Sequence, residues 1–155
     1  WNRRARRRDP PSPLADRMTS IDFYTRVADR LTVAARLAAK AVSAHGSVRV
    51  LTPDAQTTTA LDRLLWLVPP TGFLPHCRID DPLAAQTPVW IDHRLEHSGT
   101  AVVLINLHPE PPPFFSRFER LAEIVGDDDA PAGRERFRFY RERGYALRTH
   151  DMSGH

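Results

Sequence analysis

An apolar run at residues 101–107 (Ala-Val-Val-Leu-Ile-Asn-Leu) constrains the fold of this chain more than any other feature. A strand with one solvated face alternates apolar and polar residues, whereas this run is apolar on both faces. Such a strand must be covered on both sides, as the central strands of parallel sheets are. We therefore expect residues 101–107 to form the middle of a sheet.

Strand-like and helix-like patterns alternate on both sides of this run. Gly46 is a suitable end for the first helix, and Asp54 is a plausible cap for the second. This alternation predicts an α/β fold, in which helices cover both faces of a parallel or mixed sheet. We expect the other strands at residues 19–25, 47–51, 88–92, 122–125 and 145–149, and helices at residues 28–44, 54–66, 114–120 and between residues 127–129 and Gly144.

The length of 155 residues fits one domain, because a core of that size buries about two-thirds of the surface that the unfolded chain exposes. We expect this domain to span residues 18–150 and residues 151–155 to form a disordered tail. Residues 1–17 contain three prolines and no apolar periodicity. We expect translation to begin at Met18, and any translated form of residues 1–17 to be a disordered basic extension.

The positive charge is concentrated at the start of the chain. The formal net charge is +3, but six of the 22 basic and two of the 19 acidic residues lie within residues 1–17, so the remainder is close to neutral. A protein that binds nucleic acid over its whole surface needs a broad excess of cations. Any electrostatic role must therefore come from a local patch, and we expect DNA to be contacted only indirectly.

Cys77 is the single cysteine, which fits a reducing compartment and excludes an internal disulfide framework. No apolar run approaches the roughly 20 residues that a membrane span requires. We therefore expect a cytoplasmic protein without membrane contact.

The loops after the expected strands lack the glycines of phosphate-binding motifs. Neither G-x-x-x-x-G-K-[ST] nor G-x-G-x-x-G occurs, and the glycines stand apart from one another. Without such a loop the backbone offers no cradle for a phosphate. The sequence therefore predicts no phosphate-binding loop and no nucleotide cofactor.

Candidate catalytic and metal-binding side chains are also weak. His93 and His97 are four residues apart, but no third ligand has a metal-like spacing, and we expect both at the surface or in turns. Cys77 adjoins His76, yet adjacency in sequence does not supply a base in space. A nucleotide-binding or nuclease-like enzyme would need clustered carboxylates at strand ends, for which residues 80–81 and 127–129 are the candidates. We assign no catalytic residue and no metal site.

The segment at residues 134–147 combines basic and aromatic residues at helical spacing. On a helix, Arg134, Arg138 and Arg141 form one stripe, with Phe137 on its flank. We expect Arg136 to point away from this stripe. Such a stripe suits an acidic peptide, although solvated arginines beside aromatic core anchors would give the same pattern.

A proline-framed loop follows the second expected helix. Phe73 lies between turn-forming residues, so its ring is expected to stand out of the core. Trp66, at the end of the helix, is equally compatible with the core.

Five segments occur in the order seen in the chi subunit of bacterial DNA polymerase III holoenzyme, which the chain resembles over about residues 18–149. The most specific are Leu-Asp-Arg-Leu-Leu-Trp with Phe-Leu-Pro-His at residues 61–66 and 73–76, and Arg-Glu-Arg-Phe-Arg-Phe-Tyr-Arg-Glu-Arg-Gly-Tyr at residues 134–145. The others are residues 21–24, 48–51 and 88–91.

The resemblance implies a Rossmann-like fold and a non-catalytic subunit that links the clamp-loader complex to single-stranded DNA-binding protein. The family's site for the acidic C-terminal tail of that protein matches Arg134, Phe137 and Arg138, with Arg141 on the same stripe. Arginine can pair bidentately with a carboxylate, and an aromatic ring can wall a pocket for an apolar side chain.

A second surface follows from the same resemblance. The family's contact surface for the psi subunit matches Trp66, Phe73 and Pro75, and whether a DNA repair helicase shares it stays open. The family pattern also has a basic residue about one turn before Arg134, where this chain has Asp128 and Asp129.

Overall fold

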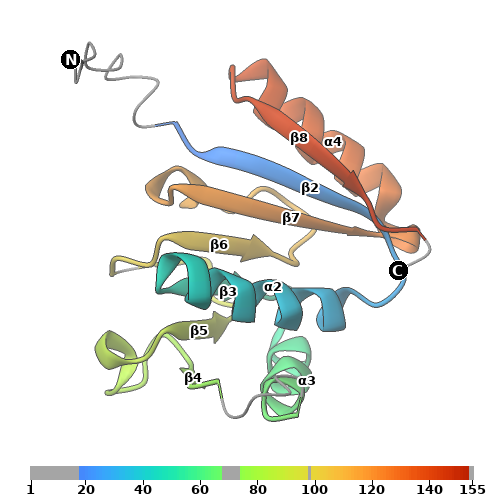
Figure 1. The fold of residues 1–155 in the computed structure, drawn as a ribbon. Helices are drawn as coiled ribbons and strands as arrows, with labels where there is room; N and C mark the ends of the chain where they lie inside the picture. Colours follow the sequence, from blue (N-terminus) through green and yellow to red (C-terminus); the bar gives the residue numbers. More distant parts are fainter. Residues whose placement is uncertain (1–17, 68–73, 98, 154–155) are drawn as a thin grey trace, which may run out of the picture.

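The computed structural model describes residues 18–67, 74–97 and 99–153, along which strands and helices alternate (Figure 1). The helices are α2 (Arg30–His45), α3 (Ala55–Leu65) and α4 (Ala130–Glu142). The strands are β2 (Ser20–Val27), β3 (Val48–Leu51), β4 (His76–Cys77), β5 (Val89–Asp92), β6 (Val103–Asn106), β7 (Arg120–Gly126) and β8 (Leu147–Asp151).

The seven strands form one sheet in the order β4-β5-β3-β6-β7-β2-β8, and every pair of neighbours is parallel. β6 is the central strand, and all four of its residues are buried. The α/β class and the central position of the apolar run at residues 101–107 are therefore confirmed.

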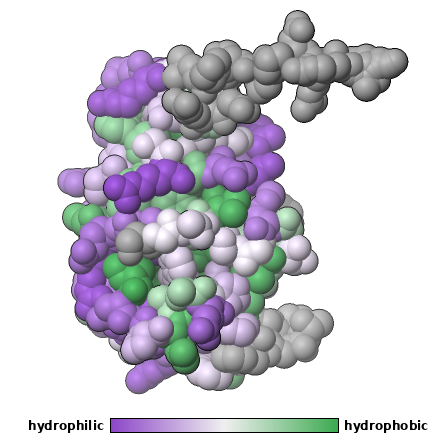
Figure 2. All heavy atoms as spheres, turned by 90° about the vertical axis from the view of Figure 1, so that its left-hand side faces the viewer, coloured by the Kyte–Doolittle hydropathy of each residue, from purple (hydrophilic) through white to green (hydrophobic). Residues whose placement is uncertain are grey.

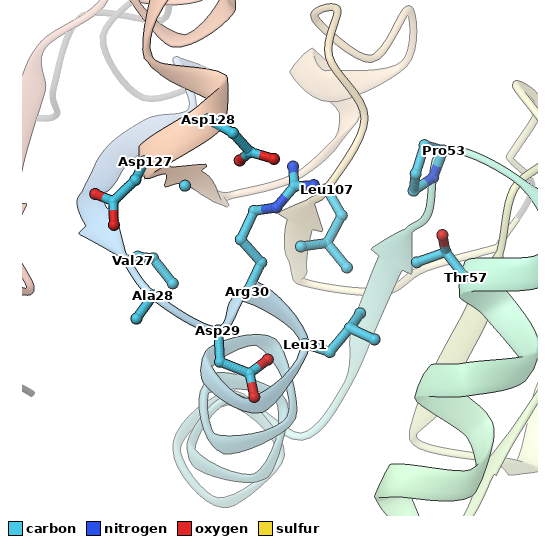
Figure 3. A pocket seen from close by; sticks show the side chains of 11 residues that line it. Val27, Ala28, Asp29, Arg30, Leu31, Pro53, Thr57, Leu107, Asp127 and Asp128 are labelled. Atoms are coloured by element: carbon cyan, nitrogen blue, oxygen red, sulfur yellow. The ribbon is translucent and has the colours of Figure 1, made fainter.

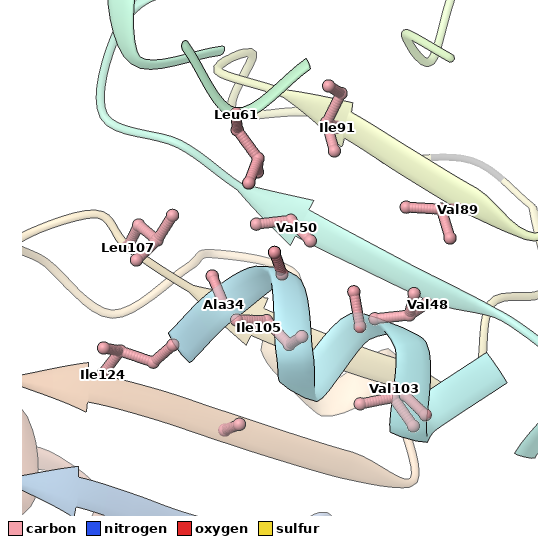
Figure 4. Close-up of a cluster of buried hydrophobic side chains, with 14 of the residues drawn as sticks. Ala34, Val48, Val50, Leu61, Val89, Ile91, Val103, Ile105, Leu107 and Ile124 are labelled. Carbon is pink, nitrogen blue, oxygen red and sulfur yellow. The ribbon is translucent and has the colours of Figure 1, made fainter. Parts of the chain in front are cut away.

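Helices cover both faces of the sheet. Val103 and Ile105 of β6 pack on one face with Ala34 of α2 and Leu61 of α3, as Figure 4 shows. Leu104 points to the opposite face, where the core includes Tyr140 of α4. The alternation of side chains along one strand thus supplies both halves of the core.

Local signals begin and end α2 and α3, and Gly46 and Asp54 have the roles that the sequence predicts. The Asp29 side chain accepts a hydrogen bond from the Thr32 amide at 3.2 Å, and Gly46 ends α2 with φ of 92°. Asp54 accepts from the Thr57 amide at 2.7 Å and caps α3. Gly46 is favoured there because a left-handed conformation carries no steric cost for glycine.

The helix expected at residues 114–120 is wrong beyond one 3-10 turn, Phe115–Arg117. The Thr19 hydroxyl donates to the Phe118 carbonyl at 2.6 Å, and Arg120 already pairs in the sheet with β2 and β6. Burial of Phe115 and Phe118 beneath the sheet holds this short connection in place. At the other end of the chain β8 reaches Asp151, and the Met152 amide donates to the Thr25 carbonyl at 2.8 Å.

Within the described part of the chain, none of the helices combines the length and the apolar character that crossing a bilayer requires.

Candidate functional site

A pocket of about 370 Å³ opens between the carboxyl ends of β2 and β7 and the first turns of α4. Phe23, Val125 and Phe137 give it apolar walls, and Arg26 and Arg134 add two cations. The Phe23 and Phe137 rings meet edge to face, with their centroids 5.2 Å apart. The pocket therefore combines an apolar interior with positive charge, an arrangement that suits an apolar side chain next to a carboxylate.

Gly133 brings α4 close to the sheet beside this pocket. A Cβ atom at this position would lie 2.6 Å from Cγ1 of Val125, closer than real Cβ atoms approach a neighbour. The helix can therefore lie this near β7 only because residue 133 has no side chain.

A fully buried polar network sets the rotation of α4 about its own axis. The Glu123 carboxylate of β7 accepts from Arg136 Nε at 2.7 Å, from the Tyr140 hydroxyl at 2.5 Å and from Asn106 Nδ2 at 2.9 Å. All four side chains are buried. Arg136 and Tyr140 face the sheet. At the angular spacing of a helix, Arg134, Arg138 and Arg141 therefore lie on its outer side.

The charges in this network depend on one another. Burial raises the pKa of the Glu123 carboxyl, and the charge of Arg136 with the three donors opposes that shift. Burial lowers the pKa of Arg136, but the charges of Glu123 and Asp129 outweigh burial and raise it above its ordinary value. We assign Glu123 the ionised form because every group that contacts its oxygens is a donor.

Arg136 points away from the stripe, as expected, but its side chain is buried in the core and does not face solvent. Its side chain is 1% exposed and pairs with both Glu123 and Asp129. The helical periodicity correctly separates Arg136 from the stripe. The Arg136 side chain points into the core because its partner Glu123 lies beneath the helix.

The predicted stripe of arginines is present on the outer face of α4. Arg134 and Phe137 line the pocket. Arg141 lies over the Phe137 ring at 5.7 Å from its centroid, and Arg138 pairs with Glu135 at 2.7 Å, both of them exposed. An exposed ion pair of this kind contributes little to the free energy of folding, so another anion can easily replace Glu135 as the partner of Arg138.

The second predicted surface is only partly described. Trp66 follows α3 and is 58% exposed, and Leu67 beside it is 79% exposed, so Trp66 does not belong to the core. The Trp66 ring meets His76 edge to face, with centroids 5.2 Å apart. Pro75 is exposed, whereas Phe73 lies outside the described residues.

A further pocket of about 570 Å³ lies at the carboxyl ends of the strands, where open α/β sheets commonly bind nucleotides (Figure 3). Three carboxylates line it, those of Asp29, Asp127 and Asp128. Arg30, the one cation among the described residues of this lining, pairs with Asp129 at 3.5 Å. This charge balance disfavours a phosphate.

The carboxylates considered for catalysis at residues 80–81 and 127–129 do not form one cluster. Asp80 pairs with Arg94 at 3.0 Å and lines a different cavity from Asp127. No group of three or more His, Cys, Asp or Glu side chains suited to a metal ion occurs in the part of the chain that the structure describes. Burial raises the pKa of the Cys77 thiol, and His76 faces Asp62 with Nε2 3.0 Å from Oδ1.

Arg49 and His97 form a buried group that the sequence prediction missed. Arg49 of β3 is fully buried and donates to the Glu96 and Arg94 carbonyls at 2.9 and 2.8 Å and to Nδ1 of His97 at 3.2 Å. Arginine has no acceptor, so Nδ1 of His97 accepts and the ring is neutral. His97 lies in the β5–β6 connection, but because it is buried the expected surface position is wrong. Its signal in the sequence is the arginine inside the otherwise apolar strand Val48–Leu51.

Burial and the nearby charges of Arg49 and Arg117 lower the pKa of His97 to about 4. Burial lowers the pKa of Arg49 to about 10, so the guanidinium stays charged at neutral pH. The hydrogen bonds of Arg49 to the Glu96 and Arg94 carbonyls hold the β5–β6 connection in place.

The face at the amino-terminal ends of the strands lies opposite both pockets. Apolar side chains on it are scattered among hydrophilic ones (Figure 2). Scattered exposed apolar residues are normal for a protein surface and define no interface.

The fold and the site together define a Rossmann-like α/β protein with an apolar pocket that two arginines border. The family model of the DNA polymerase III chi subunit, HolC, matches residues 18–148. The chain therefore belongs to the DNA polymerase III chi subunit family.

Two similar proteins are named DNA polymerase III subunit chi. The chain is 38% identical over 141 residues to the DNA polymerase III subunit chi of Pseudomonas aeruginosa, an alignment that covers 87% of this chain and 98% of the relative. It is 28% identical over 125 residues to the DNA polymerase III subunit chi of Haemophilus influenzae, which covers 77% and 85% of the two chains. The resemblance inferred from the sequence is confirmed.

Proposed function

We propose that this chain is a non-catalytic replication adaptor in the cytoplasm, which links the clamp-loader complex to single-stranded DNA-binding protein. Membership of the chi subunit family supports a place in DNA polymerase III. The charge balance of the pocket at the strand ends gives no support to the alternative of a nucleotide-binding or nuclease-like enzyme.

The acidic, carboxylate-ended tail of single-stranded DNA-binding protein is the proposed ligand of Arg134, Phe137, Arg138 and Arg141. The observation that carries this proposal is that Arg134 and Phe137 line one pocket with apolar walls. The last apolar side chain of the tail enters beside Phe137, and its carboxylates pair with the arginines of the stripe.

The affinity of this interaction is expected to be modest. A short disordered peptide must be ordered when it binds, which offsets much of the contact free energy. The arginines are exposed, so salt screens their attraction over about 8 to 10 Å. Binding should weaken as salt rises, while the apolar contact with Phe137 retains part of it.

The surface around Trp66, Phe73 and Pro75 is the proposed contact for the psi subunit of the clamp loader. Trp66 and Leu67 are exposed large apolar side chains next to each other. Exposed aromatic residues of this kind are frequent anchors of protein interfaces. The tail-binding pocket lies on α4, so the two proposed surfaces are formed by different elements.

Calorimetric titration of the tail peptide tests the proposal. Arg134→Ala should weaken binding by roughly 1.5 to 3 kcal/mol, or about tenfold to a hundredfold, because it removes a charge-assisted pair. Arg36→Ala is the matched control, since Arg36 is exposed on α2 at the opposite face of the sheet. Equal losses for both variants, or binding that does not respond to salt, would refute the proposed site.

A further inference from the structure

Arg26 has an unusual backbone conformation at the end of β2. Its φ angle is 57°, and among the residues that the structure describes it is the only one other than glycine with a positive φ. The left-handed region is strained for a residue with a Cβ atom. Strain of this kind persists where the surrounding structure imposes it, and it is concentrated at functional sites.

An irregularity in the sheet turns the Arg26 side chain to the face of α4. The pairing of β2 with β7 shifts between Tyr24 and Val27. By strict alternation Arg26 would follow Asp22 and Tyr24, which line a groove beside α2 on the other face. Arg26 instead lines the α4 pocket together with Phe23 and Thr25.

The strand regains its alternation directly afterwards. Val27, the next residue, packs into the core beside α2. A bulge that redirects one side chain and then restores the pattern is a common way to aim a residue at a site. Here the residue that is redirected is a cation.

Two arginines from distant parts of the sequence thus line the same pocket. Arg134 has no ion-pair partner within the described residues. Nη1 of Arg26 lies 3.6 Å from Oδ2 of Asp151, and both side chains are more than half exposed. A solvated pair at this distance is weak, so a carboxylate of a ligand can replace Asp151.

We propose that Arg26 is a second carboxylate-binding residue of the α4 pocket, opposite Arg134. The ligand class is a peptide with a free C-terminal carboxylate, an apolar last residue and an acidic residue shortly before it. Its apolar side chain packs against the pocket wall that Phe23 and Phe137 form together, and its two carboxylates bind one arginine each. This proposal rests on the function proposed above, and it adds that the pocket recognises two carboxylates.

Asp127 also lines the pocket and carries the opposite charge. Together with Asp151, which pairs with Arg26, it disfavours a peptide that carries acidic residues at every position. The charge pattern therefore selects for carboxylates near Arg26 and Arg134.

Arg26→Gly separates binding from folding. Glycine adopts the left-handed conformation without steric cost, so the melting temperature should be unchanged or higher. The affinity for the acidic tail peptide should fall roughly three- to tenfold, since one partly exposed charge pair is lost. Arg26→Lys keeps the charge without the planar fork and should retain part of the affinity.

Calorimetry of the full chain with the tail peptide, at low and at physiological salt, compares wild type, Arg26→Gly, Arg134→Ala and Arg36→Ala. A loss of affinity in Arg26→Gly that shrinks as salt rises, with no loss in Arg36→Ala, supports the proposal. If Arg134→Ala weakens binding and Arg26→Gly does not, the inference about Arg26 is wrong and the proposed function stands. If neither variant weakens binding, the proposed function itself fails.

An equal loss in Arg26→Gly and Arg36→Ala would show an effect of net charge alone and would also overturn the inference. A fall in the melting temperature of Arg26→Gly would assign Arg26 a structural role instead.

Discussion

Arg136 Nε donates to Glu123 Oε1 at 2.7 Å, with both side chains almost completely excluded from solvent. This ion pair joins α4 to β7, and its position on the helix decides which arginines reach the solvent. The proposed tail-binding face is therefore defined by a contact that lies on the other side of the same helix.

Removing one member of this pair should strongly destabilise the protein. Arg136→Ala leaves Glu123 as an uncompensated charge in the core, and breaking a buried pair in this way costs about 3 to 5 kcal/mol. Urea unfolding followed by circular dichroism measures the loss. Arg138→Ala is the matched control, because the Arg138–Glu135 pair is exposed and should contribute about 0 to 1 kcal/mol. Similar unfolding free energies for the two variants would show that the buried pair does not anchor α4.

Gly133→Ala should destabilise the protein although alanine favours a helix. The added Cβ would lie 2.6 Å from Val125 Cγ1, so α4 must shift or Val125 must rotate, at a cost of about 1 to 3 kcal/mol for overpacking. The helical preference of alanine over glycine offsets only about 1 kcal/mol of that. Thermal unfolding measures the difference, and Val125→Ala in the same chain should restore part of the stability. A higher melting temperature for Gly133→Ala alone would contradict this close approach.

The stability of the protein should fall at mildly acidic pH because of His97. Its pKa is about 4 in the folded protein, below the ordinary histidine value of 6.5 that we take for the unfolded chain. The unfolded chain therefore binds more protons between these values, and the free energy of unfolding rises with pH across that window. The contribution is complete above about pH 6.5 and is lost towards about pH 4.

Urea unfolding at about pH 7.5 and about pH 4.5 tests this effect against the variant His97→Gln, which does not titrate. Wild type should lose on the order of 2 kcal/mol more than the variant over this interval. Parallel losses in the two proteins would mean that His97 has no depressed pKa.

Trp66→Glu should weaken binding of the clamp-loader partner without unfolding the domain. Trp66 is 58% exposed, so its replacement opens no cavity, whereas an aromatic anchor at an interface contributes about 2 kcal/mol or more. Titration of the psi subunit should show a loss of roughly thirtyfold or more. Arg63→Ala, an exposed change on the same helix, is the control. Loss of tail-peptide binding in the Trp66 variant would show that the two surfaces are not separate.

The sequence by itself determined the alternation of strands and helices, because each element carries its own periodicity and its own end signals. Residues 101–107 could be assigned to the centre of the sheet since only a strand covered on both sides is apolar throughout. Asp54 and Gly46 were predictable for the same local reason. The spacing of Arg134, Phe137 and Arg138 already placed them on one side of a helix.

Only the tertiary structure decided which side of that helix faces the sheet. Helix α4 has arginines and aromatic residues around much of its circumference, so periodicity does not distinguish its buried side, and Glu123 beneath it selects Arg136 and Tyr140. Arg26 reaches the pocket through an irregularity in strand pairing, and His97 is buried against Arg49 of a strand 48 residues earlier. In each case a polar side chain takes its direction from a partner distant in the sequence, and that partner becomes adjacent only when the sheet is assembled.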